Sequence, residues 1–257
     1  MILQDAASLG YAPKRIVSLV PSQTELLFHL GLEAETIGIT KFCIHPNDWF
    51  STKQRIGGTK TVDINKVKAL QPDLVIANKE ENVQEQVEQL AEAFPVWLTN
   101  VNNLPEAVQM IHDIGQLTGK QEAALQIKQH ITSSFGQLQP IATTMQTAYL
   151  IWREPYMTVG GDTFIHDMLR QCGFSNIYAA ALRYPQINIP ELQQANCDLL
   201  LLSSEPYPFK QKHIDELQQQ LPSTKIILVD GEMFSWYGSR LQLSAAYFTK
   251  LIAGIQA

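Results

Sequence analysis

Short apolar runs alternate with amphipathic segments along the first half of the chain. Each run has strand length and is rich in Val, Ile and Leu, which is typical of strands buried on both faces. These strands are expected at Arg15–Val20, Thr36–Thr40, Asp73–Ala77 and Pro95–Thr99. The intervening segments repeat their apolar residues at helical spacing, and helices are expected at Ser22–Leu30, Asp63–Leu70 and Asn82–Phe94. Strands that alternate with helices predict a parallel sheet covered on both faces.

Local signals indicate where several of these helices begin and end. Ser22 and Glu25 have the spacing of a capping box at the start of the first helix, and Gly31 can end that helix. Asp63 is expected to cap the second helix, which ends before Pro72. These signals support the helical assignment of the segments between the strands.

The same order of elements begins again in the second half. Strands are expected at Thr147–Trp152, Asp198–Leu202 and Lys225–Asp230, and helices at Thr163–Cys172, Pro190–Ala195, Lys210–Leu221 and Ser239–Ile255. The halves also share a spacing, because Glu80 follows Asp73 by seven positions and Glu205 follows Asp198 by seven. If this match is not a coincidence, the halves are related lobes whose loops face each other. Open α/β sheets bind ligands in such loops, outside the carboxyl ends of their strands.

Two helices are expected between the halves, at Leu104–Leu117 and Lys120–Leu138. The second has no internal Gly or Pro before Gly136, and at 1.5 Å per residue it can extend roughly 28 Å. The predicted fold class is therefore α/β, with two Rossmann-like lobes of parallel sheets joined by one long rigid helix. The domains expected are a lobe at 1–118, the helix at 119–140 and a second lobe at 141–257.

Composition and charge narrow the class of partner. A formal net charge of −6 argues against nucleic acid, because phosphate binding requires a basic face. No segment approaches the roughly 20 apolar residues of a membrane span. The first segment, Met1–Tyr11, lacks the charged and apolar regions of a secretory signal. Either a leader is missing from this chain, or the protein stays in the cytoplasm.

The cysteines and histidines give no metal pattern. The spacing of Cys43, Cys172 and Cys197 matches no zinc site, and the last two are expected to be small buried side chains rather than a disulfide. His45 stands near Cys43, and a thiol–imidazole pair there is the weaker alternative. The other histidines lie in helical patterns and are expected to be ordinary surface or core residues.

The loops after the expected strands concentrate aromatic and charged side chains. Large apolar side chains in loops must be covered either by the lobes or by a ligand. Of these two explanations we favour the second, with a flat ligand between the lobes. The loop carboxylates Glu80, Glu81, Glu205 and Glu232 are either an acid–base pair or, as we favour, solvated or ion-paired groups.

Two glycine pairs, Gly57-Gly58 and Gly160-Gly161, match neither a P-loop nor a dinucleotide fingerprint. Turns that need a positive φ before a helix are expected at both places, with close backbone approach to a ligand as the alternative.

The opening segment Arg15–Leu26 resembles the first strand and helix of the helical-backbone metal-receptor family, the class III substrate-binding proteins for cobalamin and ferric siderophores. The likeness continues through Ala69–Ala77 and Gln86–Leu90, and resumes at Tyr184–Gln186 and Phe234–Arg240. It covers nearly the whole chain. The resemblance implies two α/β lobes rigidly joined by a long helix, with the ligand in the cleft between them.

By position, the resemblance points to Thr59, Met157, Tyr184 and Arg240 as ligand contacts. Thr59 and Met157 stand where the family has aromatic residues, which weakens stacking on a corrin face. Arg153, Arg183 and Arg240 are expected to orient the ligand, and such cations suit an anionic chelate at least as well as neutral cobalamin. The full set of expected ligand-binding residues is Thr59, Lys60, Trp152, Arg153, Tyr156, Met157, Arg183, Tyr184, Glu205, Phe234, Trp236, Tyr237 and Arg240.

The expected function is that of a binding protein, not an enzyme: a monomer without cofactor that captures a metal chelate for an ABC importer in the periplasm. Family members dock on the permease through one glutamate per lobe, and those positions hold Asn65 and Pro190 here, with Glu191 one residue away. An ABC permease is expected as a partner, but without the family's usual pair of glutamate contacts. One alternative is a cytoplasmic enzyme or chaperone acting on a tetrapyrrole or metal chelate through His45 with Glu80 or Glu205. Another is a sensory or scaffold protein that binds a partner protein.

Overall fold

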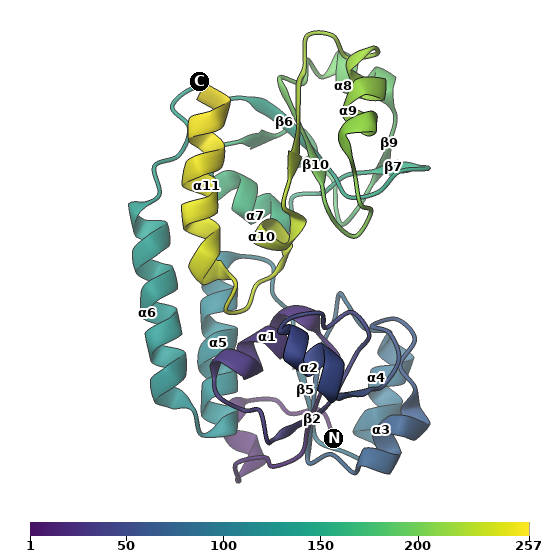
Figure 1. Ribbon diagram of the computed structural model, residues 1–257, viewed down its shortest axis with the longest axis vertical. Coiled ribbons are helices and arrows are strands. Elements are labelled where there is room, and N and C mark those ends of the chain that lie inside the picture. The colour runs from purple at the N-terminus through teal and green to yellow at the C-terminus, as the bar shows by residue number, and fades with distance from the viewer. Residues whose placement is uncertain (257) are drawn as a thin grey trace. The chain divides into compact units, whose positions relative to one another are not determined.

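The computed structural model describes residues 1–256, which form two units, each built around a parallel sheet (Figure 1). Unit 1 comprises residues 1–101, 105–132 and 236–242, and unit 2 comprises 102–104, 133–235 and 243 onward. The expected α/β class with parallel sheets is confirmed.

The sheet of unit 1 has the strand order β3-β2-β1-β4-β5. Its strands β1 and β4 are fully buried, which explains their continuous apolar sequence. The strands are β1 (Ile16–Ser18), β2 (Thr36–Ile39), β3 (Gln54–Arg55), β4 (Leu74–Asn78) and β5 (Val96–Thr99). The helices of this part of the chain are η1 (Ala6–Leu9), α1 (Pro21–His29), α2 (Asn47–Thr52), α3 (Ile64–Leu70), α4 (Gln84–Ala91) and α5 (Leu104–Thr118). Residues 1–3 lie along the outer edge of β5, where Ile2 bridges Val96.

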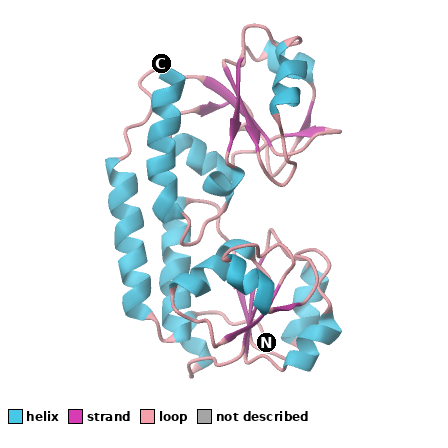
Figure 2. Ribbon diagram, viewed as in Figure 1, coloured by secondary structure: helices cyan, strands magenta, loops and turns pink. Residues whose placement is uncertain are grey.

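The main sheet of unit 2 has the order β11-β10-β6-β8, and a short antiparallel pair, β7-β9, stands beside it (Figure 2). The strands are β6 (Gln146–Leu150), β7 (Tyr156–Met157), β8 (Ser175–Asn176), β9 (Gln186–Ile187), β10 (Leu199–Ser203) and β11 (Lys225–Val229). The helices are α7 (Phe164–Gln171), α8 (Ile189–Gln194), α9 (Gln211–Gln218), α10 (Gly231–Ser235) and α11 (Leu241–Gln256).

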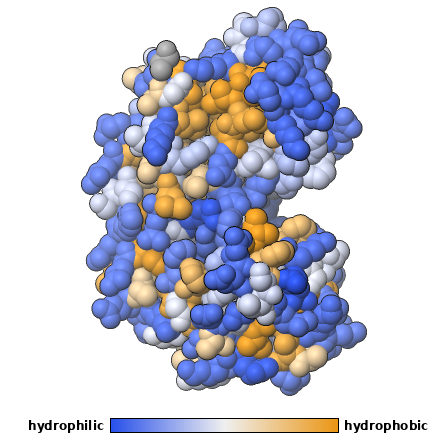
Figure 3. Space-filling view, viewed as in Figure 1, coloured by the Kyte–Doolittle hydropathy of each residue, from blue (hydrophilic) through white to orange (hydrophobic). Residues whose placement is uncertain are grey.

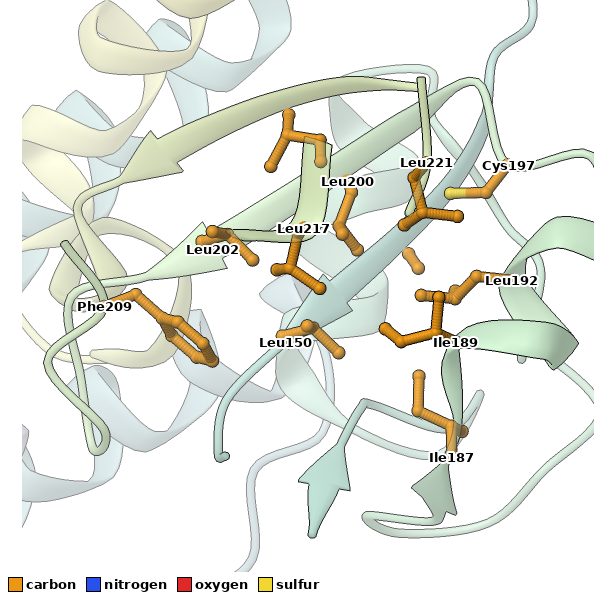
Figure 4. Packing of buried hydrophobic residues seen from close by; sticks show 12 residues of the cluster. Leu150, Ile187, Ile189, Leu192, Cys197, Leu200, Leu202, Phe209, Leu217 and Leu221 are labelled. Atoms are coloured by element: carbon orange, nitrogen blue, oxygen red, sulfur yellow. The ribbon is translucent and has the colours of Figure 1, made fainter. Parts of the chain in front are cut away.

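Each face of the unit 2 sheet has its own apolar layer. On one face, Leu150, Leu200 and Leu202 of the strands pack with side chains of α8 and α9 (Figure 4). On the other, Phe234 of α10 lies 5.2 Å from the Tyr149 ring, measured between centroids, and 4.7 Å from that of Phe248 in α11. Hydrophilic residues predominate on the face of the molecule in Figure 3, with apolar patches between them.

The two sheets share one arrangement. The order β8-β6-β10-β11 corresponds to β2-β1-β4-β5, and unit 2 has no counterpart of β3 among the described residues. The aspartates that precede β4 and β10 also act alike. Asp73 accepts hydrogen bonds from the backbone of Lys14 and Arg15 at 2.8 Å, and Asp198 accepts one from that of Gln146 at 2.8 Å. The aspartate of the repeated spacing therefore has the same structural role in both sheets.

The helix expected between the halves is α6 (Gln121–Gln137), and its residues divide between the units after Thr132. The chain also passes between the two units at a second place, which no pattern in the sequence predicted. Residues 236–242 group with unit 1, although the chain on either side of them belongs to unit 2. We call this segment the strap.

Some local expectations are confirmed and others are wrong. Asp63 caps α3 by accepting from the Lys66 N–H at 3.1 Å, as expected. The capping box at Ser22 is wrong, because α1 begins at Pro21 and no side chain caps it. The short elements η1, α2, β3, β7, β8, β9 and α10 were not expected. Most of them are too short to show a hydrophobic period.

The expected turn with a positive φ is present at the first glycine pair and absent at the second. Gly57 has φ +101°, so the expected turn is confirmed there. Gly160 and Gly161 do not need a positive φ, and that expectation is wrong. The backbone of residues 179–182 approaches them instead, so that a Cβ on Gly161 would lie 2.1 Å from the Ala179 carbonyl oxygen.

No described helix is long and apolar enough to cross a membrane.

Candidate functional site

A buried asparagine ties together the loops at the carboxyl edge of the unit 1 sheet. The Asn82 side-chain amide donates to the carbonyl oxygens of Leu19, at 3.3 Å, and Thr59, at 3.1 Å. Its oxygen accepts from the Asn78 N–H at 2.8 Å. The loops after β1, β3 and β4 are thereby held in one piece. Sequence analysis treated Asn82 only as the start of a helix, and no periodic signal distinguishes it.

The strap is fixed to α1 by a buried ion pair. Arg240 donates from Nε to Glu25 Oε2 at 2.9 Å and from Nη2 to Oε1 at 2.6 Å, and each side chain is only 10% exposed. The Ser239 hydroxyl lies 2.9 Å from His29 Nδ1. A Cβ on Gly238 would lie 2.3 Å from the Ser22 carbonyl oxygen, so only glycine allows the strap to approach this closely.

The two aromatic residues of the strap are also covered by other parts of unit 1. The Trp236 ring stands edge-on to His45, 5.4 Å away between centroids, and Arg240 Cζ lies 4.8 Å from its centre. Tyr237 donates from its hydroxyl to Glu81 Oε1 at 2.7 Å. Burial, with the nearby Glu81 carboxylate, raises the pKa of Tyr237 well above its usual value. The fold itself, rather than a ligand, supplies most of the cover for Trp236 and Tyr237.

Cys43 is buried among hydroxyl groups. Its thiol lies 3.1 Å from Thr24 Oγ1 and 3.2 Å from Thr40 Oγ1. Burial raises the pKa of Cys43 to about 11. A thiol with this pKa is a poor nucleophile at neutral pH, and the His45 ring packs against Trp236. Cys172 and Cys197 are buried free thiols, as expected.

In unit 2, the turn after β6 presents an aromatic side chain at the carboxyl edge of the sheet. Trp152 is 40% exposed and stands edge-on to Tyr207, with 5.8 Å between ring centroids. A backbone bridge joins Trp152 to Met157, and Tyr156 and Met157 are half-buried in β7. The structure therefore brings Trp152, Tyr156 and Met157 together. Arg153 points to the helix α9 and donates from Nη2 to Glu216 Oε2 at 2.7 Å.

The remaining predicted residues of unit 2 have protein partners as well. The Arg183 guanidinium lies 3.7 Å from Asp162 Oδ2 and covers the Tyr184 ring, with 5.9 Å between Cζ and the ring centre. Glu205 accepts from the Ser235 hydroxyl at 2.6 Å, and Phe234 is fully buried in the core.

The two positions that correspond to the family's docking glutamates are exposed. Asn65 lies on α3 and Pro190 in the first turn of α8. Glu191 contributes to the cap of α8, where its Oε1 accepts from the Asn188 side chain at 2.8 Å. Among residues 1–256, no group of three or more His, Cys, Asp or Glu side chains is placed to hold a metal ion.

Comparisons with known proteins identify a family. The model of the family described as periplasmic binding protein matches residues 16–225. A vitamin B12-binding protein of Yersinia pestis (strain Pestoides F) is 23% identical over 256 residues, which is 95% of this chain and 88% of that protein.

Solved structures share the fold. The periplasmic vitamin B12 binding protein BtuF of Vibrio cholerae superposes with a TM-score of 0.77 at 19% identity, covering 95% of this chain and 98% of its own. The periplasmic heme-binding protein BhuT, in complex with two hemes, gives a TM-score of 0.82 at 17% identity, covering 96% and 100%.

Proposed function

Because this chain belongs to the periplasmic binding protein family, we propose that it is the substrate-binding protein of an ABC importer. We propose further that its cargo is a metal chelate of the cobalamin, haem or siderophore class. The observation that carries the proposal is the family match over residues 16–225, which includes every strand of both sheets except β11, of which it includes only the first residue. The role of such a protein is to bind its substrate for transport, and this role requires no turnover.

Two features of the fold support the proposal. The loops at the carboxyl edges of both sheets carry the aromatic and cationic side chains, and ligands of open α/β sheets bind at that edge. Trp152 is partly exposed on such a loop, beside Tyr156 and Met157. Flat, apolar chelates gain affinity from contacts with aromatic and Met side chains.

Cellular location and the importer are inferred from the relatives. The B12- and heme-binding structures above are of periplasmic proteins, and we propose the same location for this chain. The positions of the two usual docking glutamates hold Asn65 and Pro190, and Glu191 stands next to the second of them. We propose that docking on a permease uses at least one group other than those two glutamates.

Titration of the purified protein against cyanocobalamin, haem and several ferric siderophores, followed by tryptophan fluorescence, tests the proposal. Trp152 is the expected reporter, while Trp49 is fully buried and serves as the internal reference. We expect saturable quenching by one chelate at micromolar concentration or below. Most of the signal should disappear in Trp152→Phe, and it should persist in Trp49→Phe. The absence of a response to every chelate would refute the proposed cargo class.

A further inference from the structure

The arginines of the candidate loops are each paired with a carboxylate. Arg240 is paired with the buried Glu25, Arg153 with Glu216, and Arg183 lies beside Asp162. A guanidinium whose charge is balanced at close range attracts a further anion only weakly. These residues are therefore poor candidates for the main recognition of an anionic ligand.

Two lysines at the carboxyl edge of the unit 1 sheet contact neutral groups instead, and a third is exposed beside them in the chain. Lys60 donates from Nζ to the Glu80 carbonyl oxygen at 2.6 Å. Lys41 Nζ lies over the Phe42 ring, 5.1 Å from its centre. Lys79 is exposed in the loop that follows β4. A carbonyl dipole and an aromatic ring orient an ammonium group without cancelling its charge.

The turn at residues 57–60 brings these lysines to one place. Lys41 donates from its backbone N–H to the Gly57 carbonyl oxygen at 2.8 Å. A Cβ on Gly58 would lie 3.3 Å from Lys41 Cε and 3.2 Å from Phe42 Cε2. On its other side, the turn reaches the β4 loop through the bond from Lys60 to Glu80. The turn therefore connects the loops after β2 and β4, and Lys79 is the chain neighbour of the residue that Lys60 contacts.

Apolar side chains are exposed in the first of these loops. Phe42 is 50% exposed and Ile44 is 40% exposed. Exposed large apolar side chains in one short segment are typical of surfaces that a ligand or a partner covers. The positive charges of Lys41, Lys60 and Lys79 contrast with the whole chain, whose net charge is −6. In the β4 loop, the Glu81 carboxylate accepts a hydrogen bond from the Tyr237 hydroxyl at 2.7 Å.

We propose that Lys41, Lys60 and Lys79, with Phe42 and Ile44, form the surface that recognises the cargo, and that the cargo is an anionic chelate with an apolar body. We call this surface the lysine rim. The inference rests on the proposed function and deepens it, because it selects carboxylate-bearing tetrapyrroles and anionic ferric chelates over neutral cobalamin. Lysine ammonium groups act as hydrated point charges, so this recognition is sensitive to salt.

The test compares two triple variants that lose the same charge. The rim variant is Lys41→Gln with Lys60→Gln and Lys79→Gln. The control replaces three exposed lysines elsewhere, Lys14, Lys68 and Lys250. The probes are haem, with two free carboxylates, its dimethyl ester, which lacks both, and cyanocobalamin. Affinity is measured at 50 and 500 mM NaCl.

We expect the wild type to bind haem more tightly than either of the other probes. Each rim lysine should contribute about two- to fivefold in affinity, so that the rim variant loses about tenfold or more. The control variant should keep its affinity, and Lys→Arg at all three rim positions should restore binding. The salt dependence of haem binding should largely disappear in the rim variant. Circular dichroism confirms that each variant is folded.

Three results would overturn the inference, and only the last of them also overturns the proposed function. If haem or a siderophore binds with equal affinity to the rim and control variants, the lysine rim is not the recognition surface, while the proposed function stands. The same conclusion holds if cyanocobalamin is the preferred ligand and its binding is insensitive to salt. If the wild type binds none of these chelates or the ferric siderophores, the proposed function fails and the inference fails with it.

Discussion

Removal of one partner of the Glu25–Arg240 pair is expected to destabilise unit 1 strongly. The two hydrogen bonds are 2.9 and 2.6 Å long, and both side chains are 10% exposed. At an effective permittivity of about 20, unit charges about 4 Å apart attract by about 4 kcal/mol. In Glu25→Gln the arginine stays buried without its counter-charge, so we expect a loss of about 3–5 kcal/mol in the free energy of unfolding.

The assay is urea denaturation, followed by tryptophan fluorescence and by far-UV circular dichroism. The double variant Glu25→Leu with Arg240→Met replaces the pair by apolar side chains of similar length. Its stability should fall within about 1 kcal/mol of the wild type, because no charge is left buried alone. Trp236 reports on the strap locally, since its ring contacts Arg240.

An exposed ion pair provides the control for this prediction. Lys66 lies 3.7 Å from Asp63, and its side chain is 54% exposed, so Lys66→Ala should change stability by less than about 1 kcal/mol. If Glu25→Gln costs no more than Lys66→Ala, or if the losses in Glu25→Leu and Arg240→Met simply add in the double variant, the pair does not anchor the strap and the reasoning is wrong.

Three further outcomes are expected. Gly161→Ala should destabilise by about 1–3 kcal/mol because its Cβ meets the Ala179 carbonyl oxygen, whereas Gly254→Ala, with open space in α11, should be neutral or stabilising in the same denaturation assay. Burial, with nearby Arg and Lys side chains, lowers the pKa of His213 in the folded protein. As the pH falls, this histidine is therefore protonated in the unfolded chain before it is protonated in the folded one. Stability should therefore decrease below about pH 6.5, by up to about 1.4 kcal/mol per pH unit, and a slope unchanged in His213→Gln would contradict this. Cys43, with its pKa raised to about 11, should resist iodoacetamide at pH 7.5 until the protein unfolds, as mass spectrometry can check.

The sequence was sufficient for the longer elements and for the class of the fold. Apolar runs such as that at β4 and helical spacing such as that at α6 are local properties, and burial of those side chains leaves few alternatives. The repeated aspartate before β4 and β10 was also visible, and the structure gives its reason in the backbone hydrogen bonds that both residues accept.

The candidate site was only partly accessible from the sequence. The loops that follow the expected strands do lie at the carboxyl edges of the two sheets, because any parallel sheet gathers the carboxyl ends of its strands at one edge. Which side chains remain available to a ligand depends on partners that are far away in the chain. Trp236 was expected at the ligand but is covered by protein, whereas Lys41 and Phe42, which were not among the expected contacts, are exposed.

The strap shows most clearly what the tertiary structure alone decides. Glu25 fits a capping box when only its neighbours in the sequence are considered, yet its carboxylate binds Arg240, 215 positions later. Hydrophobic periodicity reports whether a side chain is buried within its own element. A pair of charged residues has no period, and its energy arises only when folding brings the two groups together and excludes water from them.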